Sequence, residues 1–298
     1  MPIFPAPLCK GDTIAIVSPA SIIDPTLVER ASATLKLLGY NVRVMPHALG
    51  KNGSYSGSIE ERLEDMTAAL LDNDVRAILC SRGGYGCVHL LDRLASLDLN
   101  ADPKWIIGFS DVSALHALMA NRGIVSIHGS MAKALALYPH NSPFNAMLLD
   151  MLGGKRPALE FPAHKYNRNG TATGILSGGN LAVLQALIDT PYDIFSDRIL
   201  FIEDVAEPIY KVERILYQLR LSGRLSRLKG LIIGRFTLYQ ADKDFDDIYD
   251  MMAPLLEGLR IPVAFDAPIG HISENMPVLH GATATLETCG DCSRISYF

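Results

Sequence analysis

The sequence predicts an α/β protein in two parts, a parallel-sheet domain followed by a strand-richer second domain. Over the first half, short apolar runs alternate with segments of helical spacing, which is typical of a parallel sheet with helices on both faces. Near residue 155 this regularity stops and the chain becomes polar and turn-rich. The length of 298 residues is enough for two ordinary domains.

Residues 1–155 are therefore predicted to form a Rossmann-like or flavodoxin-like domain. Helix-start signals support this reading, since Asp24-Pro25 offers an N-cap with a proline at the first helical position and Ser58-Ile-Glu-Glu61 is a capping box. Ligands of such sheets bind beyond the carboxyl ends of the strands. The expected strands are residues 13–17, 41–45, 75–81, 105–107 and 124–128.

Residues 156–170 read as a linker, and residues 171–298 as a strand-rich, barrel-like α/β domain. Its strands are expected at residues 199–203, 228–236 and 262–267, with a hairpin at the end of the chain. Cys289-Gly-Asp-Cys292 has the spacing of a metal or redox pair, but no second cysteine or histidine pair completes a zinc site. A hairpin turn is the better interpretation.

The composition limits what the protein can bind and where it works. A net charge of −5 with no basic block argues against nucleic acid as a partner. No apolar run approaches the roughly 18–20 residues of a membrane span, and the first residues resemble a strand more than a signal peptide. Five cysteines, an odd number, favour a reducing compartment. We therefore expect a cytoplasmic protein.

The most informative stretch joins a buried strand directly to a helix. The apolar run Trp105-Ile-Ile107 stops at Gly108-Phe-Ser-Asp111, and helical spacing begins at once. A serine on such a sharp turn presents its hydroxyl clear of the sheet, as nucleophilic serines do. Alternatively, Ser110 only caps the helix, a role that serine also performs well. The stretch alone leaves both readings open.

A nucleophilic serine needs a base, an acid that orients the base, and donors for the oxyanion. Among eight histidines, His271 follows a glycine at the end of a strand-like stretch, a usual setting for a site residue. His89 and His116 lie inside predicted helices, where a surface or core role is expected, and His128 ends a strand where it could line a pocket.

Two carboxylates compete as the orienting acid, and spacing does not separate them. Glu203 ends an apolar strand, and Glu207 follows four residues later. The backbone N–H of Asp111 and one from the Gly83-Gly84 turn are candidate oxyanion donors. Arg82-Gly-Gly-Tyr-Gly86 could instead cradle phosphate, but it matches neither G-x-G-x-x-G nor a P-loop.

Taken together, these motifs resemble the murein tetrapeptide LD-carboxypeptidases, the serine peptidase family that also contains the microcin C immunity peptidase. Each motif is weak alone, but five in the family's order over almost the whole chain are specific. They are Arg82-Gly-Gly-Tyr-Gly86, Gly108-Phe-Ser-Asp111, Gly178-Gly-Asn-Leu181, Leu200-Phe-Ile-Glu-Asp204 with Val212-Glu-Arg214, and Gly270-His271.

The resemblance implies that Ser110 is the nucleophile, His271 the general base and Glu203, rather than Glu207, the orienting acid. It implies that Asp111 and Gly84 donate the oxyanion hydrogen bonds. Gly83 and Asn180 are expected, on weaker grounds, to line the substrate cleft. The triad would be assembled from both domains. Neither a metal nor a cofactor is expected.

The implied activity is removal of the terminal D-alanine from the cytoplasmic murein tetrapeptide L-Ala-γ-D-Glu-meso-diaminopimelate-D-Ala in peptidoglycan recycling, by a homodimer. The alternatives are a microcin-C-type immunity peptidase with the same triad and a non-catalytic two-domain ligand-binding protein. A nucleotide-dependent oxidoreductase is disfavoured because no dinucleotide fingerprint is present.

Overall fold

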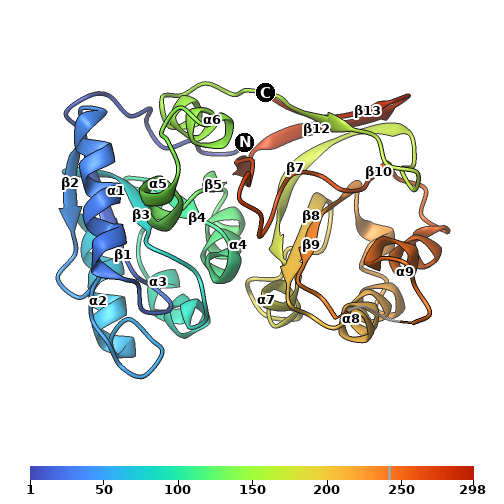
Figure 1. Cartoon of the computed structure of the whole chain (residues 1–298), viewed down its shortest axis with the longest axis horizontal. Coiled ribbons are helices and arrows are strands. Elements are labelled where there is room, and N and C mark those ends of the chain that lie inside the picture. The colour runs from blue at the N-terminus through green and yellow to red at the C-terminus, as the bar shows by residue number, and fades with distance from the viewer. Residues whose placement is uncertain (241–242) are drawn as a thin grey trace. The chain divides into compact units, whose positions relative to one another are not determined.

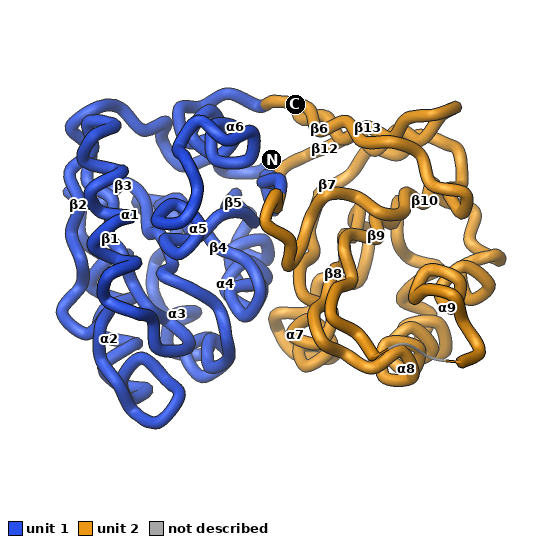
Figure 2. The backbone as a smooth tube through the Cα atoms, in the orientation of Figure 1, with its two compact units in different colours: residues 1–156, 276–281 blue, residues 157–275, 282–298 orange. Residues whose placement is uncertain are grey.

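The computed structural model describes residues 1–240 and 243–298. It divides into two compact units (Figure 2). The first unit is Met1–Arg156 with Met276–Gly281, and the second is Pro157–Asn275 with Ala282–Phe298. The mixed α/β class predicted from the sequence is confirmed.

The first unit is built on a six-stranded sheet of order β11-β5-β4-β3-β1-β2, of which Figure 1 labels β1 to β5. The five strands of the N-terminal part run parallel, and their order 2-1-3-4-5 is that of flavodoxin-like folds. Only β11 is antiparallel, and it pairs with β5. The strands are β1 (Thr13–Val17), β2 (Asn41–Val44), β3 (Val75–Cys80), β4 (Trp105–Gly108), β5 (Ser126–His128) and β11 (Val278–His280).

The helices of this unit fall into two groups, as right-handed crossovers require. From β1 the chain moves one way across the sheet to β2 and then the other way through β3, β4 and β5, so α1 lies on the face opposite to α2, α3 and α4. Accordingly, α1 packs on α5, whereas α3 packs on both α2 and α4. The helices are α1 (Pro25–Leu37), α2 (Ile59–Leu71), α3 (Leu91–Ala95), α4 (Ser113–Asn121), α5 (Ala132–Leu137) and α6 (Pro143–Leu152).

Both predicted helix starts are confirmed. The Asp24 carboxylate accepts a hydrogen bond from the Thr26 N–H at 2.9 Å and caps α1. In α2, Ser58 and Glu61 form the reciprocal capping box. These local bonds satisfy N–H groups that no helical carbonyl can reach.

The second unit is built on a seven-stranded sheet of order β10-β9-β8-β7-β12-β13-β6. Strands β7 to β10 are parallel neighbours, and β12, β13 and β6 are antiparallel. Arg168, in the segment after β6, bridges to Val263 of β10 at the opposite edge, which gives the sheet its barrel-like curl. The elements are β6 (Leu159–Pro162), β7 (Gly170–Asn180), α7 (Leu181–Gln185), β8 (Arg198–Val205), α8 (Ile209–Leu221), β9 (Gly230–Thr237), α9 (Ile248–Leu256), β10 (Val263–Ala264), β12 (Thr283–Cys289) and β13 (Cys292–Tyr297).

Two boundaries predicted from the sequence need correction. The stretch 156–170 is not only a linker, because it contains β6, which pairs with β13. The stretch 171–298 is not one continuous domain either, because residues 276–281 return to the first unit as β11. By contrast, the hairpin around Cys289-Gly-Asp-Cys292 is confirmed, with the two cysteines opposite each other and Gly290 at φ 57° in the turn.

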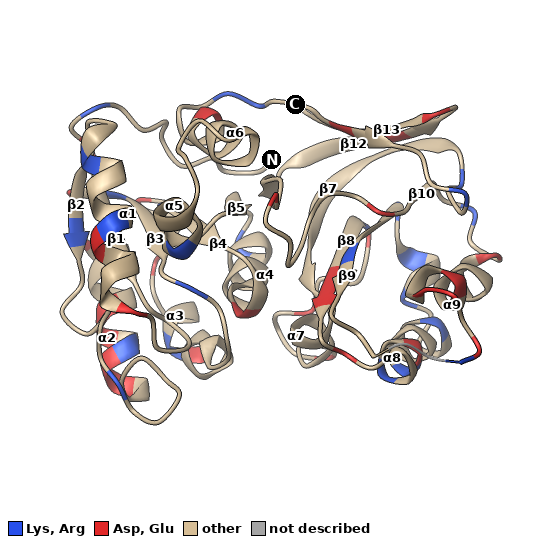
Figure 3. Cartoon of the chain, viewed as in Figure 1, with Lys and Arg blue, Asp and Glu red and all other residues tan. Residues whose placement is uncertain are grey.

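Within the described parts of the chain, no helix has the length and apolar character needed to cross a bilayer. Acidic and basic residues are interspersed along both units (Figure 3).

Candidate active site

Ser110 lies on a strained turn between β4 and α4. Phe109 is extended, Ser110 has φ 65°, and a 3-10 turn over Ser110–Val112 leads into the helix. A non-glycine residue in the left-handed region costs on the order of 1 kcal/mol or more and is concentrated at functional sites. The N-cap of the turn is Phe109, so helix capping does not account for Ser110.

A buried histidine supports the strand end just before this turn. Nε2 of His116 lies 2.8 Å from the Gly108 carbonyl, and Nδ1 lies 2.8 Å from the Ser126 hydroxyl. Because a carbonyl only accepts, Nε2 carries the proton and Nδ1 accepts from Ser126. Burial lowers the pKa of His116 to about 4, so the ring is neutral at pH 7. The expected core role of His116 is confirmed.

His128 also belongs to this core instead of lining a pocket. It is fully buried, and its ring centroid lies 5.9 Å from that of Phe109. His89 lies on the 3-10 turn before α3, where Nδ1 is 3.1 Å from the Arg62 guanidinium.

The loop after β3 approaches Ser110 through a glycine. A Cβ placed on Gly83 would lie 2.6 Å from the Ser110 Cβ and 2.8 Å from its Oγ. It would also lie 3.4 Å from the backbone nitrogen of Asp111. Gly84 has φ 122°, and a Cβ there would collide with the Ser21 side chain. Only glycine therefore allows this loop to lie against both the serine and the following amide.

The second unit brings Glu203 and His271 together. Nδ1 of His271 lies 2.7 Å from Oε2 of Glu203, which is fully buried at the end of β8. Since the carboxylate accepts, Nδ1 carries the proton and Nε2 is the atom that can act as a base. A Cβ on Gly270, at φ 134°, would lie 2.9 Å from Oε2 of Glu203, so the glycine before His271 makes room for the pair.

Burial and the carboxylate act in opposite directions on His271. Burial lowers its pKa, but the hydrogen bond to Glu203 and the charges of Glu203 and Asp204 raise it, and the net pKa is above the ordinary value. The carboxylate therefore favours the imidazolium that forms when His271 accepts a proton.

Two residues that the sequence analysis did not single out hold the backbone around His271. The Gly270 N–H donates to Oδ1 of Asn275 at 2.9 Å, and the Thr237 hydroxyl donates to the His271 carbonyl at 3.2 Å. The signal was weak, because Asn275 lies in the unremarkable run Ile272-Ser-Glu-Asn275 after the histidine.

Asn180 has a structural role that the resemblance did not imply. Its Oδ1 accepts from the Val183 N–H at 3.1 Å and caps α7, and its Nδ2 donates to Asp204 at 2.6 Å. Asp204 also accepts from the Ala182 N–H, and burial raises its pKa to about 6. The cap therefore anchors the residue next to Glu203.

Glu207, the competing acid, is engaged elsewhere. Its carboxylate lies 2.7 Å from Nζ of Lys211, one turn along α8. The described contacts of His271 with a carboxylate oxygen involve Glu203 and not Glu207.

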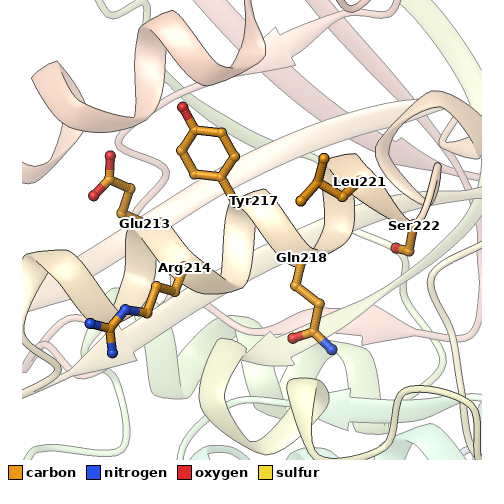
Figure 4. A pocket seen from close by; sticks show the side chains of 6 residues that line it. All are labelled: Glu213, Arg214, Tyr217, Gln218, Leu221 and Ser222. Atoms are coloured by element: carbon orange, nitrogen blue, oxygen red, sulfur yellow. The ribbon is translucent and has the colours of Figure 1, made fainter.

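An open hollow of 710 Å³ follows one side of α8 and is separate from these residues (Figure 4). It is lined by Glu213, Arg214, Tyr217, Gln218, Leu221 and Ser222, all from one helix and its C-cap. A hollow along a single helix lacks the converging polar groups of a ligand site. Among the described residues, no group of three His, Cys, Asp or Glu side chains could hold a metal ion.

The geometry thus provides a strained serine against a glycine loop in one unit, and in the other a histidine hydrogen-bonded to a fully buried glutamate. Models of the LD-carboxypeptidase N-terminal domain match residues 14–129, and those of the C-terminal domain match residues 173–286. Ser110 falls in the first range, and Glu203 and His271 fall in the second.

Individual relatives cover nearly the whole chain. The murein tetrapeptide carboxypeptidase of Pseudomonas aeruginosa is 31% identical, over 92% of each chain. The microcin C7 self-immunity protein of Escherichia coli is 27% identical, over 93% of this chain and 91% of its own. The crystal structure of a muramoyltetrapeptide carboxypeptidase from Oxalobacter formigenes has a TM-score of 0.85 and 29% identity, over 96% of this chain and 98% of that one. The chain therefore belongs to the LD-carboxypeptidase family, and it is a serine-type carboxypeptidase.

Proposed function

We propose that the protein releases the terminal D-alanine from the cytoplasmic murein tetrapeptide L-Ala-γ-D-Glu-meso-diaminopimelate-D-Ala during peptidoglycan recycling. The observation that carries the catalytic part is the 2.7 Å hydrogen bond between His271 and the fully buried carboxylate of Glu203. The substrate is supported by the likeness to the Pseudomonas aeruginosa murein tetrapeptide carboxypeptidase. A homodimer is part of the same proposal.

In the proposed mechanism, Nε2 of His271 takes the hydroxyl proton of Ser110 as Oγ attacks the diaminopimelate carbonyl. The oxyanion is held by the N–H groups of Asp111 and Gly84, and Glu203 stabilises the imidazolium. His271 then gives its proton to the departing amine of D-alanine. Water, deprotonated by His271, hydrolyses the acyl-enzyme and regenerates Ser110.

The microcin C7 self-immunity relative supports a second candidate, a peptidase that cuts a nucleotide-bearing peptide with the same three residues. The higher identity to the murein enzyme favours the muropeptide.

The test is free D-alanine release from the tetrapeptide by the wild type and by Ser110→Ala, Glu203→Ala and His271→Ala. We expect turnover by the wild type and losses of at least about 10³-fold for the serine and histidine variants. A wild type that releases no D-alanine but cleaves an aminoacyl-nucleotide peptide would instead establish the second candidate.

A further inference from the structure

Arg62 is a buried arginine on α2, which is otherwise an amphipathic surface helix. Its exposed fraction is only 2%. A buried guanidinium is costly unless its N–H groups find acceptors. Here one nitrogen donates to the Pro19 carbonyl at 2.7 Å and to the Gly86 carbonyl at 3.0 Å. The others contact the Ser58 carbonyl at 3.2 Å and Nδ1 of His89 at 3.1 Å.

Two of these acceptors belong to loops that leave the carboxyl ends of parallel strands. Pro19 follows β1, and Gly86 closes the glycine loop Arg82–Gly86 after β3. A Cβ on Gly86, at φ 125°, would lie 2.7 Å from the guanidinium nitrogen, so glycine allows the contact. The ring of Tyr55 covers the cation with its centroid 5.0 Å away.

The same loop is also hydrogen-bonded to Asp111, the residue after Ser110. The Cys87 N–H donates to Oδ2 of Asp111 at 2.7 Å, and Asp111 is buried. Burial lowers the pKa of Arg62, and the charge of Asp111 opposes that effect, so the two side chains also interact electrostatically. Consecutive residues, Gly86 and Cys87, are thus held by Arg62 and Asp111.

We propose that Arg62 is a positioning residue for the oxyanion-binding amide of the glycine loop. The proposal rests on the proposed serine mechanism. Three glycines make the loop intrinsically flexible, whereas an oxyanion donor must be placed to within about 0.5 Å. Arg62 fixes the far end of the loop, and Gly83 then lies against Ser110. Arg62 acts through the loop and does not touch the substrate.

The test compares Arg62→Gln and Arg62→Lys with the wild type in kcat, KM and inhibition by a trifluoromethyl ketone analogue of the tetrapeptide. Oγ of Ser110 adds to the ketone carbonyl of this probe and forms a tetrahedral oxyanion. For Arg62→Gln we expect kcat to fall about 10²–10³-fold, with KM changed less than about threefold and ketone affinity lost in parallel. Arg62→Lys should recover part of both, because an ammonium can still donate to the two carbonyls.

A matched control is Arg224→Lys, because Arg224 is a largely buried arginine that binds Asp189 and Asp193 in the second unit. It should lower the unfolding temperature without changing kcat. A folded Arg62→Gln enzyme with wild-type kcat and ketone affinity would overturn the proposal.

Should Arg62→Gln fail to fold, Arg62→Lys decides, because it keeps the charge but replaces the planar guanidinium, which reaches four acceptors, by a single ammonium. A smaller fall in kcat with a parallel loss of ketone affinity is expected, and unchanged kcat and ketone affinity would overturn the proposal. A wild type that binds the ketone at Ser110 but releases no D-alanine would refute the proposed substrate, and the ketone comparison would still test Arg62.

Discussion

Replacing Glu203 by glutamine removes the charge beside His271 while keeping the volume and hydrogen-bonding capacity of the side chain. In the proposed mechanism His271 accepts the serine proton, and its charge then faces a fully buried carboxylate across a 2.7 Å hydrogen bond. With charge centres about 4 Å apart and an effective dielectric constant of about 20, the attraction is about 4 kcal/mol. Its loss corresponds to about a 10³-fold lower kcat/KM.

The pH dependence of kcat/KM provides a second, independent test of the role of Glu203. The proposed mechanism requires neutral His271, so kcat/KM should fall as the pH drops through its pKa, which burial and Glu203 together leave above the ordinary 6.5. In Glu203→Gln the carboxylate that raises the pKa of His271 is gone, so burial lowers that pKa. The acid limb of the kcat/KM profile should therefore move to lower pH. For stability, a raised pKa means that the pair stabilises the fold below pH 6.5 and that this contribution is lost as the pH rises through the folded pKa.

The assay is D-alanine release from the tetrapeptide between pH 5 and 9, with Glu207→Gln as the control. Glu207 pairs with Lys211 on the surface of α8, so its variant should keep the wild-type rate and profile. If Glu203→Gln stays within tenfold of wild type with an unmoved acid limb, the assigned role of Glu203 is wrong.

Three further outcomes follow from the geometry. Gly83→Ala should lower kcat by at least about 10²-fold, because its Cβ would lie 2.8 Å from the Ser110 Oγ. The control Gly258→Ala, whose Cβ would meet nothing within 4 Å, should keep the wild-type kcat. Equal kcat values for the two variants would contradict the close approach of Gly83 to Ser110. His116 is neutral in the fold, with a pKa lowered to about 4, so the unfolded chain binds more protons and stability is lost as the pH falls from 6.5 towards 4. In urea unfolding, the wild type should therefore lose about 2–3 kcal/mol relative to His116→Gln between pH 7 and 4.5, and parallel losses in the two proteins would refute the assignment. Asn180→Ala should lower the free energy of unfolding by about 1–2 kcal/mol through loss of the α7 cap, whereas a higher KM at unchanged stability would show a substrate contact instead.

The sequence was most informative where local patterns decide the structure. The apolar run before Gly108 and the helical spacing after it predicted a sharp strand-to-helix turn, and Ser58 with Glu61 predicted the start of α2. The left-handed φ of Ser110 was not visible, since it depends on packing around the turn.

The features that could not be predicted from the sequence depend on contacts between distant segments of the chain. Arg62 reads as a polar residue of an amphipathic helix, and its burial arises because the loops after β1 and β3 close over it. Strand β11 is too short to stand out, and it forms only because β5 offers a free edge. In β6, Leu159 and Phe161 alternate with exposed residues, a period-2 pattern hidden within a turn-rich stretch.

The central step of the proposed mechanism is the activation of Ser110 by His271. Its most direct test is the rate at which a fluorophosphonate labels the protein, with the modified residue identified by mass spectrometry in the wild type and in His271→Ala. We expect labelling at Ser110 in the wild type and a rate at least about 10³-fold lower in the variant. Labelling of another residue, or equal rates in the two proteins, would contradict this mechanism.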